Sequence, residues 1–69
     1  MKRAIVEHEG HRILVQPTKN SVRYSIYKFV NGEQFGIGDE YKEDTEVNRG
    51  KFIQAATAAF ERARAAPFN

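Results

Sequence analysis

The sequence predicts an α+β domain in which a four-stranded antiparallel sheet, built from two hairpins, is covered on one face by a C-terminal helix (β-β-β-β-α). The only long stretch with helical periodicity lies at the C-terminal end of the 69 residues. Two short turn sequences, Glu9-Gly10 and Asn31-Gly32, each separate two strand-like runs. A chain of this length supports one domain, 1–69, near the lower size limit for an independent core.

The first hairpin is predicted from strands at about 3–8 and 11–16, joined by Glu9-Gly10. Glycine tolerates the positive φ that a two-residue turn requires, and the second strand is rich in β-branched residues. This turn fixes the register, and side chains alternate between the two faces of a strand. We assign one face of this hairpin to the core: Ala4, Val6, Ile13 and Val15. The opposite face carries Ile5, Glu7, Arg12 and Leu14.

The second hairpin is predicted from strands at about 22–30 and 33–38. Asn-Gly is the preferred pair for a type I′ turn, so Asn31-Gly32 is the strongest local signal in the chain. The resulting register assigns four residues to the core: Tyr24, Ile26, Phe35 and Ile37. The other face carries Arg23, Ser25, Tyr27, Phe29, Gln34 and Gly36. Gly36 and Gly38 are weak strand residues, which indicates a bulge or a close approach of another backbone.

The helix is predicted over about 48–65. Its apolar residues recur at a period of 3.6 and form one face: Phe52, Ala56, Ala59, Phe60 and Ala63. Arginines in its last turns stabilise the negative end of the helix dipole, and Pro67 is predicted to end the helix. The start lies between about 45 and 51, with Asn48 as a plausible N-cap and Thr45 or Asp44 as alternatives.

The composition limits the classes of function. There is no cysteine, the net charge is +2, and no apolar run approaches the length that spans a membrane. We therefore expect a cytoplasmic protein with no membrane partner. Five of the nine acidic residues lie between Asp39 and Glu46, and we interpret this segment as a loop that caps the helix.

Residues for catalysis are scarce. No serine occurs in a nucleophile-elbow sequence, and no glycine-rich loop precedes a helix N-terminus. His8 and His11 flank the first turn and could share a divalent ion, but two nitrogens without a third fixed ligand make a poor zinc site. We therefore interpret them as an exposed hairpin end. We expect no enzymatic activity, no cofactor and no small-molecule substrate.

One helix cannot cover both faces of the sheet. The uncovered face would carry a set of apolar and basic side chains that we predict to bind a partner: Ile5, Arg12, Leu14, Arg23, Tyr27 and Phe29. Protein interfaces favour aromatic residues and arginine, so the expected partner is another protein or a second copy in a homodimer. The alternative is a nucleic acid, with Tyr27 and Phe29 stacking on bases while Arg23 holds phosphate. The small net charge favours protein.

Three segments carry a resemblance to a known family. They are Gly10–Pro17 (GHRILVQP), Tyr24-Ser25-Ile26, and the alanine-rich stretch from Ala55 through Phe60 to Ala63. On these residues the chain resembles a family of short, uncharacterised proteobacterial proteins with two hairpins and a C-terminal helix. The resemblance covers most of the chain and implies a bacterial sheet-plus-helix domain. It brings no catalytic residues.

Overall fold

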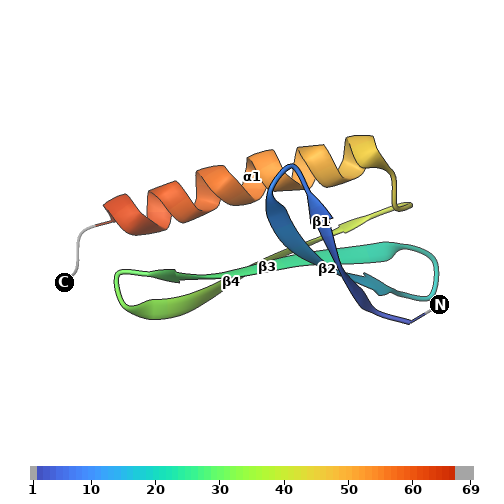
Figure 1. The fold of residues 1–69 in the computed structure, drawn as a ribbon, viewed down its shortest axis with the longest axis horizontal. Helices are drawn as coiled ribbons and strands as arrows, with labels where there is room; N and C mark the ends of the chain where they lie inside the picture. Colours follow the sequence, from blue (N-terminus) through green and yellow to red (C-terminus); the bar gives the residue numbers. More distant parts are fainter. Residues whose placement is uncertain (1, 67–69) are drawn as a thin grey trace.

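A computed structural model describes residues 2–66 and confirms the predicted fold class. Four strands form one antiparallel sheet in the order β1-β2-β3-β4, followed by the single helix α1. Their bounds are β1 Ala4–His8, β2 His11–Pro17, β3 Val22–Val30, β4 Glu33–Tyr41 and α1 Glu46–Ala65. The helix lies over one side of the long β3–β4 hairpin (Figure 1), and the molecule is elongated, with extents of 41 × 19 × 19 Å. No helix within residues 2–66 is long and apolar enough to cross a membrane.

Both hairpin turns have the predicted geometry. Glu9 and Gly10 have φ values of 50° and 79°, and Asn31 and Gly32 have values of 52° and 84°. Positive φ at both central residues is the mark of the type I′ turn, whose twist matches that of the flanking strands. The pairing is therefore the expected one, as the partners of Ile5 (Leu14) and of Ile26 (Ile37) illustrate.

The core lies between the sheet and α1. It comprises Ile13, Val15, Val22, Tyr24, Ile26, Val30, Phe52, Ile53, Ala56 and Phe60. The burial of Ile53 was not predicted, because the apolar face predicted from a period of 3.6 residues includes its neighbour Phe52 but not Ile53. Two predicted core residues are wrong in part: Ala4 is exposed, and Phe35 is 38% exposed although it lies on the helix side. Both lie toward an end of an edge strand, where α1 covers less.

The segment between the sheet and the helix differs most from the prediction. β4 continues to Tyr41, so Asp39 and Glu40 belong to a strand and not to a capping loop. Tyr41 pairs with Val22 and packs on Tyr24 with ring centroids 5.1 Å apart, and this contact extends the strand. The helix starts at Glu46, two residues before the predicted start, and its N-cap is Thr45.

The cap geometry explains this choice. Thr45 has extended backbone angles, and its hydroxyl accepts a hydrogen bond from the N–H of Asn48 at 3.0 Å. The side chain of Asn48 instead donates to the carbonyl of Glu43 at 2.8 Å. Asn48 therefore supports the loop that leads into the helix rather than capping it.

The two hairpins pair over only part of their length. β2 pairs with β3 from Pro17–Val22 to Leu14–Ser25, and no pair follows. Beyond this point the β1–β2 hairpin leaves the β3–β4 ribbon and rises toward the level of α1, which β1 contacts (Figure 1). The bend keeps Ile13 and Val15 buried in the core. It also leaves the outer half of β3 without a neighbour on that side.

Candidate binding surface

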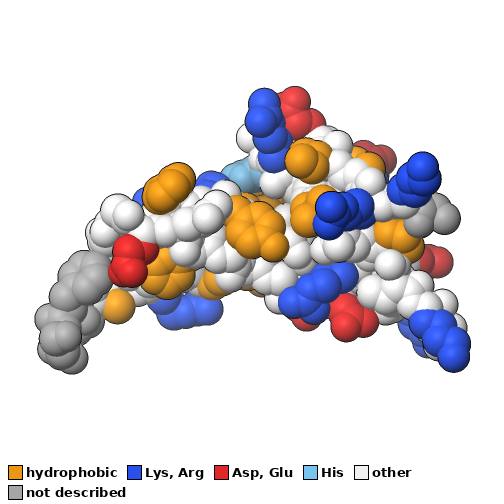
Figure 2. Space-filling model, turned by 90° about the horizontal axis from the view of Figure 1, so that it is seen from below, with side chains coloured by type: hydrophobic (Ala, Val, Ile, Leu, Met, Phe, Trp, Pro, Cys, Tyr) orange, Lys and Arg blue, Asp and Glu red, His pale blue; other side chains and the backbone are white. Residues whose placement is uncertain are grey.

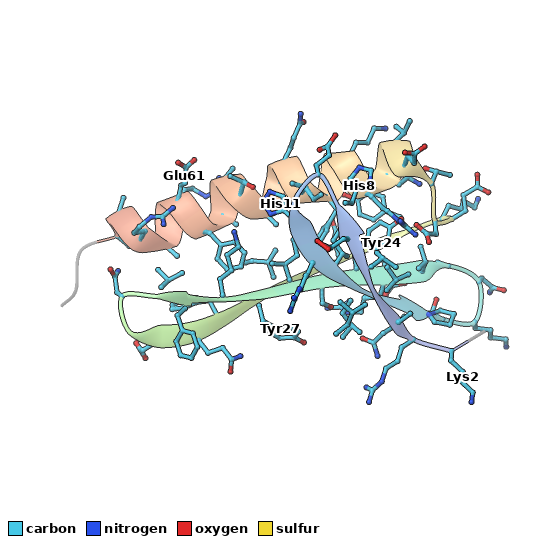
Figure 3. The ribbon with its side chains drawn as sticks, viewed as in Figure 1. Lys2, His8, His11, Tyr24, Tyr27 and Glu61 are labelled. Atoms are coloured by element: carbon cyan, nitrogen blue, oxygen red, sulfur yellow. The ribbon has the colours of Figure 1, made fainter. Side chains whose placement is uncertain are left out.

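The open face of the sheet, opposite α1, carries three strongly exposed apolar side chains. Ile5 is 69% exposed, Tyr27 58% and Phe29 77%. Tyr27 projects away from the helix (Figure 3), and the view from below shows apolar side chains lying between several Lys and Arg side chains (Figure 2). No pocket is hollowed into the surface of residues 2–66. The face is therefore a raised, mixed apolar and basic surface.

Tyr27 is positioned by a glycine on the neighbouring strand. Its Cα partner is Gly36, and a methyl group added to Gly36 would lie 2.6 Å from Cε1 of Tyr27. One edge of the ring therefore lies over β4, in the space that the Cβ of any other residue at this position would occupy, which is how an aromatic side chain covers a strand glycine. The prediction of a bulge or a close backbone approach is therefore wrong at Gly36, because the register is regular there and the group that comes close is a side-chain ring. Phe29 pairs with Gln34 and is, among residues 2–66, the most exposed of the large apolar residues.

The side chain of Arg23 lies over Gly38 in the same way. A methyl group on Gly38 would lie 2.8 Å from Nη2 of Arg23. The guanidinium reaches Oε1 of Glu40 at 4.0 Å, and Glu40 also accepts a hydrogen bond from the hydroxyl of Ser21 at 2.9 Å. Such an exposed pair contributes well under about 1 kcal/mol, but it places a carboxylate beside the arginine.

The remaining predicted residues lie on the half of the face near the N-terminus. Ile5 pairs with Leu14, which is half-buried, and Leu14 pairs with Ser25. Ser25, the cross-strand partner of Leu14, is buried on this open face, with 6% exposure. Arg12 is exposed opposite Glu7 but is not brought to Tyr27, since β2 leaves β3 before that position.

His8 and His11 are direct cross-strand partners at the end of the β1–β2 hairpin. Both lie level with α1 (Figure 3), and both are half-buried rather than exposed as expected. Nε2 of His8 is 3.9 Å from a carboxylate oxygen of Glu9. No group of three or more possible ligands that could hold a metal ion occurs within residues 2–66.

A hydrogen-bonded cluster on the helix side fixes the start of α1. The hydroxyl of Tyr24 donates to Oδ1 of Asp44 at 2.7 Å, and Arg49 donates to both oxygens of Asp44, also at 2.7 Å. Burial, followed by the bond to Asp44, raises the pKa of Tyr24 to about 12. The hydrogen bonds from Arg49 lower the pKa of Asp44. The cluster joins β3, the loop and α1, so it is structural.

Sequence reasoning missed two features that lie outside the open face. Val47 is 66% exposed on the first turn of α1, away from the sheet. Lys28 lies on the helix side of β3 with its ammonium 5.7 Å from the ring centre of Phe60. The position of Lys28 follows from the alternation between Tyr27 and Phe29, but its lack of a neighbouring strand depends on the bend in β2.

A scan against models of protein families, a search of curated proteins and a search of solved structures each find no match to this chain.

Proposed function

We propose that this protein is a non-enzymatic binding module whose open sheet face docks onto another protein. One observation carries the proposal: Ile5, Tyr27 and Phe29 are each more than half exposed on the one face that α1 does not cover. Burial of such side chains contributes about 1.5–3 kcal/mol each, which is the usual driving force of protein association.

The charges of this face support a protein partner over a nucleic acid. Arg23 lies beside Glu40, and Arg12 stands opposite Glu7. A phosphate backbone would meet these carboxylates together with the arginines, and binding to phosphate depends on an excess of positive charge. A face with exposed apolar side chains, on which each of these two arginines has a carboxylate beside or opposite it, suits a protein surface of mixed character.

Sedimentation of the chain over a range of concentrations, with and without a short DNA duplex, tests the proposal. A docking face of this kind also brings two copies together at high concentration, so we expect reversible association that the double variant Tyr27→Ala/Phe29→Ala abolishes. Val47→Ala is the matched control, because it removes an equally exposed apolar side chain outside the face. Circular dichroism checks that each variant is folded.

Salt separates the two partner classes. Association through apolar contacts should change little between low and moderate salt, whereas nucleic-acid binding should fall steeply. A wild-type chain that stays monomeric at millimolar concentration, or a control variant as defective as the double variant, would contradict the proposal. Salt-sensitive binding of DNA that requires Arg23 would favour the nucleic-acid alternative.

A further inference from the structure

The outer half of β3 has a free edge on the side that β2 vacates. Pairing between β2 and β3 ends at Leu14–Ser25, and no strand or loop backbone within residues 2–66 bonds to β3 beyond that pair on this side. Open strand edges are sites where further strands add. This edge differs from the outer edges of β1 and β4, because it lies inside the sheet, between a departing strand and the exposed Tyr27 and Phe29.

The register shows which backbone groups are free. In a hairpin closed by a two-residue turn, the residues that flank the turn form a hydrogen-bonded pair, here Val30 and Glu33. Val30, Lys28 and Ile26 therefore direct their backbone groups toward β4. Tyr27 and Phe29 direct theirs to the vacant side, where each offers one donor and one acceptor.

We infer that this edge binds an extended segment of the partner protein, which adds to β3 as an antiparallel strand. The inference rests on the proposed function and names how the partner binds. Residues of the segment opposite Tyr27 and Phe29 would share the open face with them, where cross-strand neighbours lie about 5 Å apart. The two positions of the segment opposite Tyr27 and Phe29 therefore favour apolar side chains, because these would cover the two rings that are exposed in the free protein.

The position between them selects an acidic residue. The residue at this position lies opposite Lys28, and its side chain is on the helix side of the sheet. The two residues form a non-hydrogen-bonded pair, in which the side chains are closer together than in a hydrogen-bonded pair. No carboxylate within residues 2–66 lies within 4.0 Å of the ammonium of Lys28, which rests near the ring of Phe60. The recognised segment thus has the pattern apolar–acidic–apolar.

For strand pairing at this edge, the pattern points to a different protein rather than to a second copy. None of the nine acidic residues of the chain has an apolar residue on both sides. A self-paired arrangement centred on Lys28 would also place two lysines directly opposite each other, which is destabilising.

Amide hydrogen exchange measured by NMR tests the inference. The probe is the blocked peptide Thr-Val-Glu-Val-Thr, and the control peptide carries lysine in place of glutamate. In the free protein, the amides of Tyr27 and Phe29 should exchange faster than those of Ile26 and Lys28. With the glutamate peptide at ten times its Kd, exchange at Tyr27 and Phe29 should slow about tenfold, because only the free fraction exchanges. The amide of Ile5, on the outer edge of β1, should not change.

A charge exchange tests the role of Lys28. The wild-type chain should prefer the glutamate peptide over the lysine peptide by up to about fivefold, the range for an opposed charge pair across strands. Lys28→Glu should reverse this preference, and Lys28→Gln, which also removes the contact of the ammonium with Phe60, should abolish it.

Two results would overturn the inference. If millimolar peptide shifts the ring signals of Tyr27 and Phe29 without slowing exchange of their amides, the open face binds but the edge does not pair. If neither rings nor amides respond, edge recognition is refuted, and the proposed function is then decided separately by sedimentation. A preference for glutamate that survives Lys28→Glu would refute the role of Lys28.

Discussion

Replacing Asp44 by alanine tests whether the cluster at the start of α1 stabilises the fold. The side chain of Tyr24 is fully buried, and its hydroxyl has Asp44 as acceptor at 2.7 Å. Leaving a buried hydroxyl without its acceptor costs about 1–3 kcal/mol. Loss of the partly exposed pair with Arg49 adds up to about 1 kcal/mol. We therefore expect Asp44→Ala to lower the free energy of unfolding by about 1–4 kcal/mol, a large part of the roughly 5 kcal/mol of a domain this size.

Urea denaturation followed by circular dichroism at neutral pH measures this loss. The matched background is Tyr24→Phe, which has no hydroxyl to satisfy. In that background Asp44→Ala should cost only the contribution of the Arg49 pair, about 1 kcal/mol or less. Equal costs in the two backgrounds would refute the reasoning, because they would mean that water replaces the acceptor.

Two further predictions concern Tyr24 and the glycine under Tyr27. Burial and the bond to Asp44 raise the pKa of Tyr24 from its usual 10 to about 12, so the stability this hydroxyl confers is complete below pH 10 and is lost as the pH rises toward 12. Alkaline titration of the unfolding free energy should therefore show a loss of about 2–3 kcal/mol over this range that Tyr24→Phe lacks; parallel curves for the two proteins would exclude it. Gly36→Ala should destabilise the wild type by about 1 kcal/mol, because the added methyl meets the ring of Tyr27 at 2.6 Å. In a Tyr27→Ala background the same change should instead stabilise by about 0.5 kcal/mol, and thermal unfolding that shows no change of sign would disprove the contact.

Local chemistry explains why much of the fold could be predicted. The turns at Glu9-Gly10 and Asn31-Gly32 need positive φ at two successive residues, and each turn sets the register of its hairpin. The alternation of side chains along a strand then places Tyr27 and Phe29 on one face, independently of the rest of the chain. These predictions depend on neighbours within a few residues, and the structure agrees with them.

The errors fall where burial depends on distant residues. Phe35 lies on the helix side as predicted, yet its exposure depends on how far α1 extends over the end of the hairpin. Ser25 lies on the open face as predicted, yet it is buried at its pairing with Leu14 of the other hairpin. Alternation assigns a face, but it does not determine how much of that face is covered.

By itself, the sequence determined the two hairpins, their registers, the single C-terminal helix and the side chains of the open face. Each of these depends on turn geometry or on periodicity along a short segment. Only the tertiary structure decided that β2 pairs with β3 from Leu14 onward and not over residues 11–13, because the β1–β2 hairpin must bend to keep Ile13 in the core while β3 and β4 continue beneath α1. That bend frees the backbone of Tyr27 and Phe29, and it cannot be derived from any one segment.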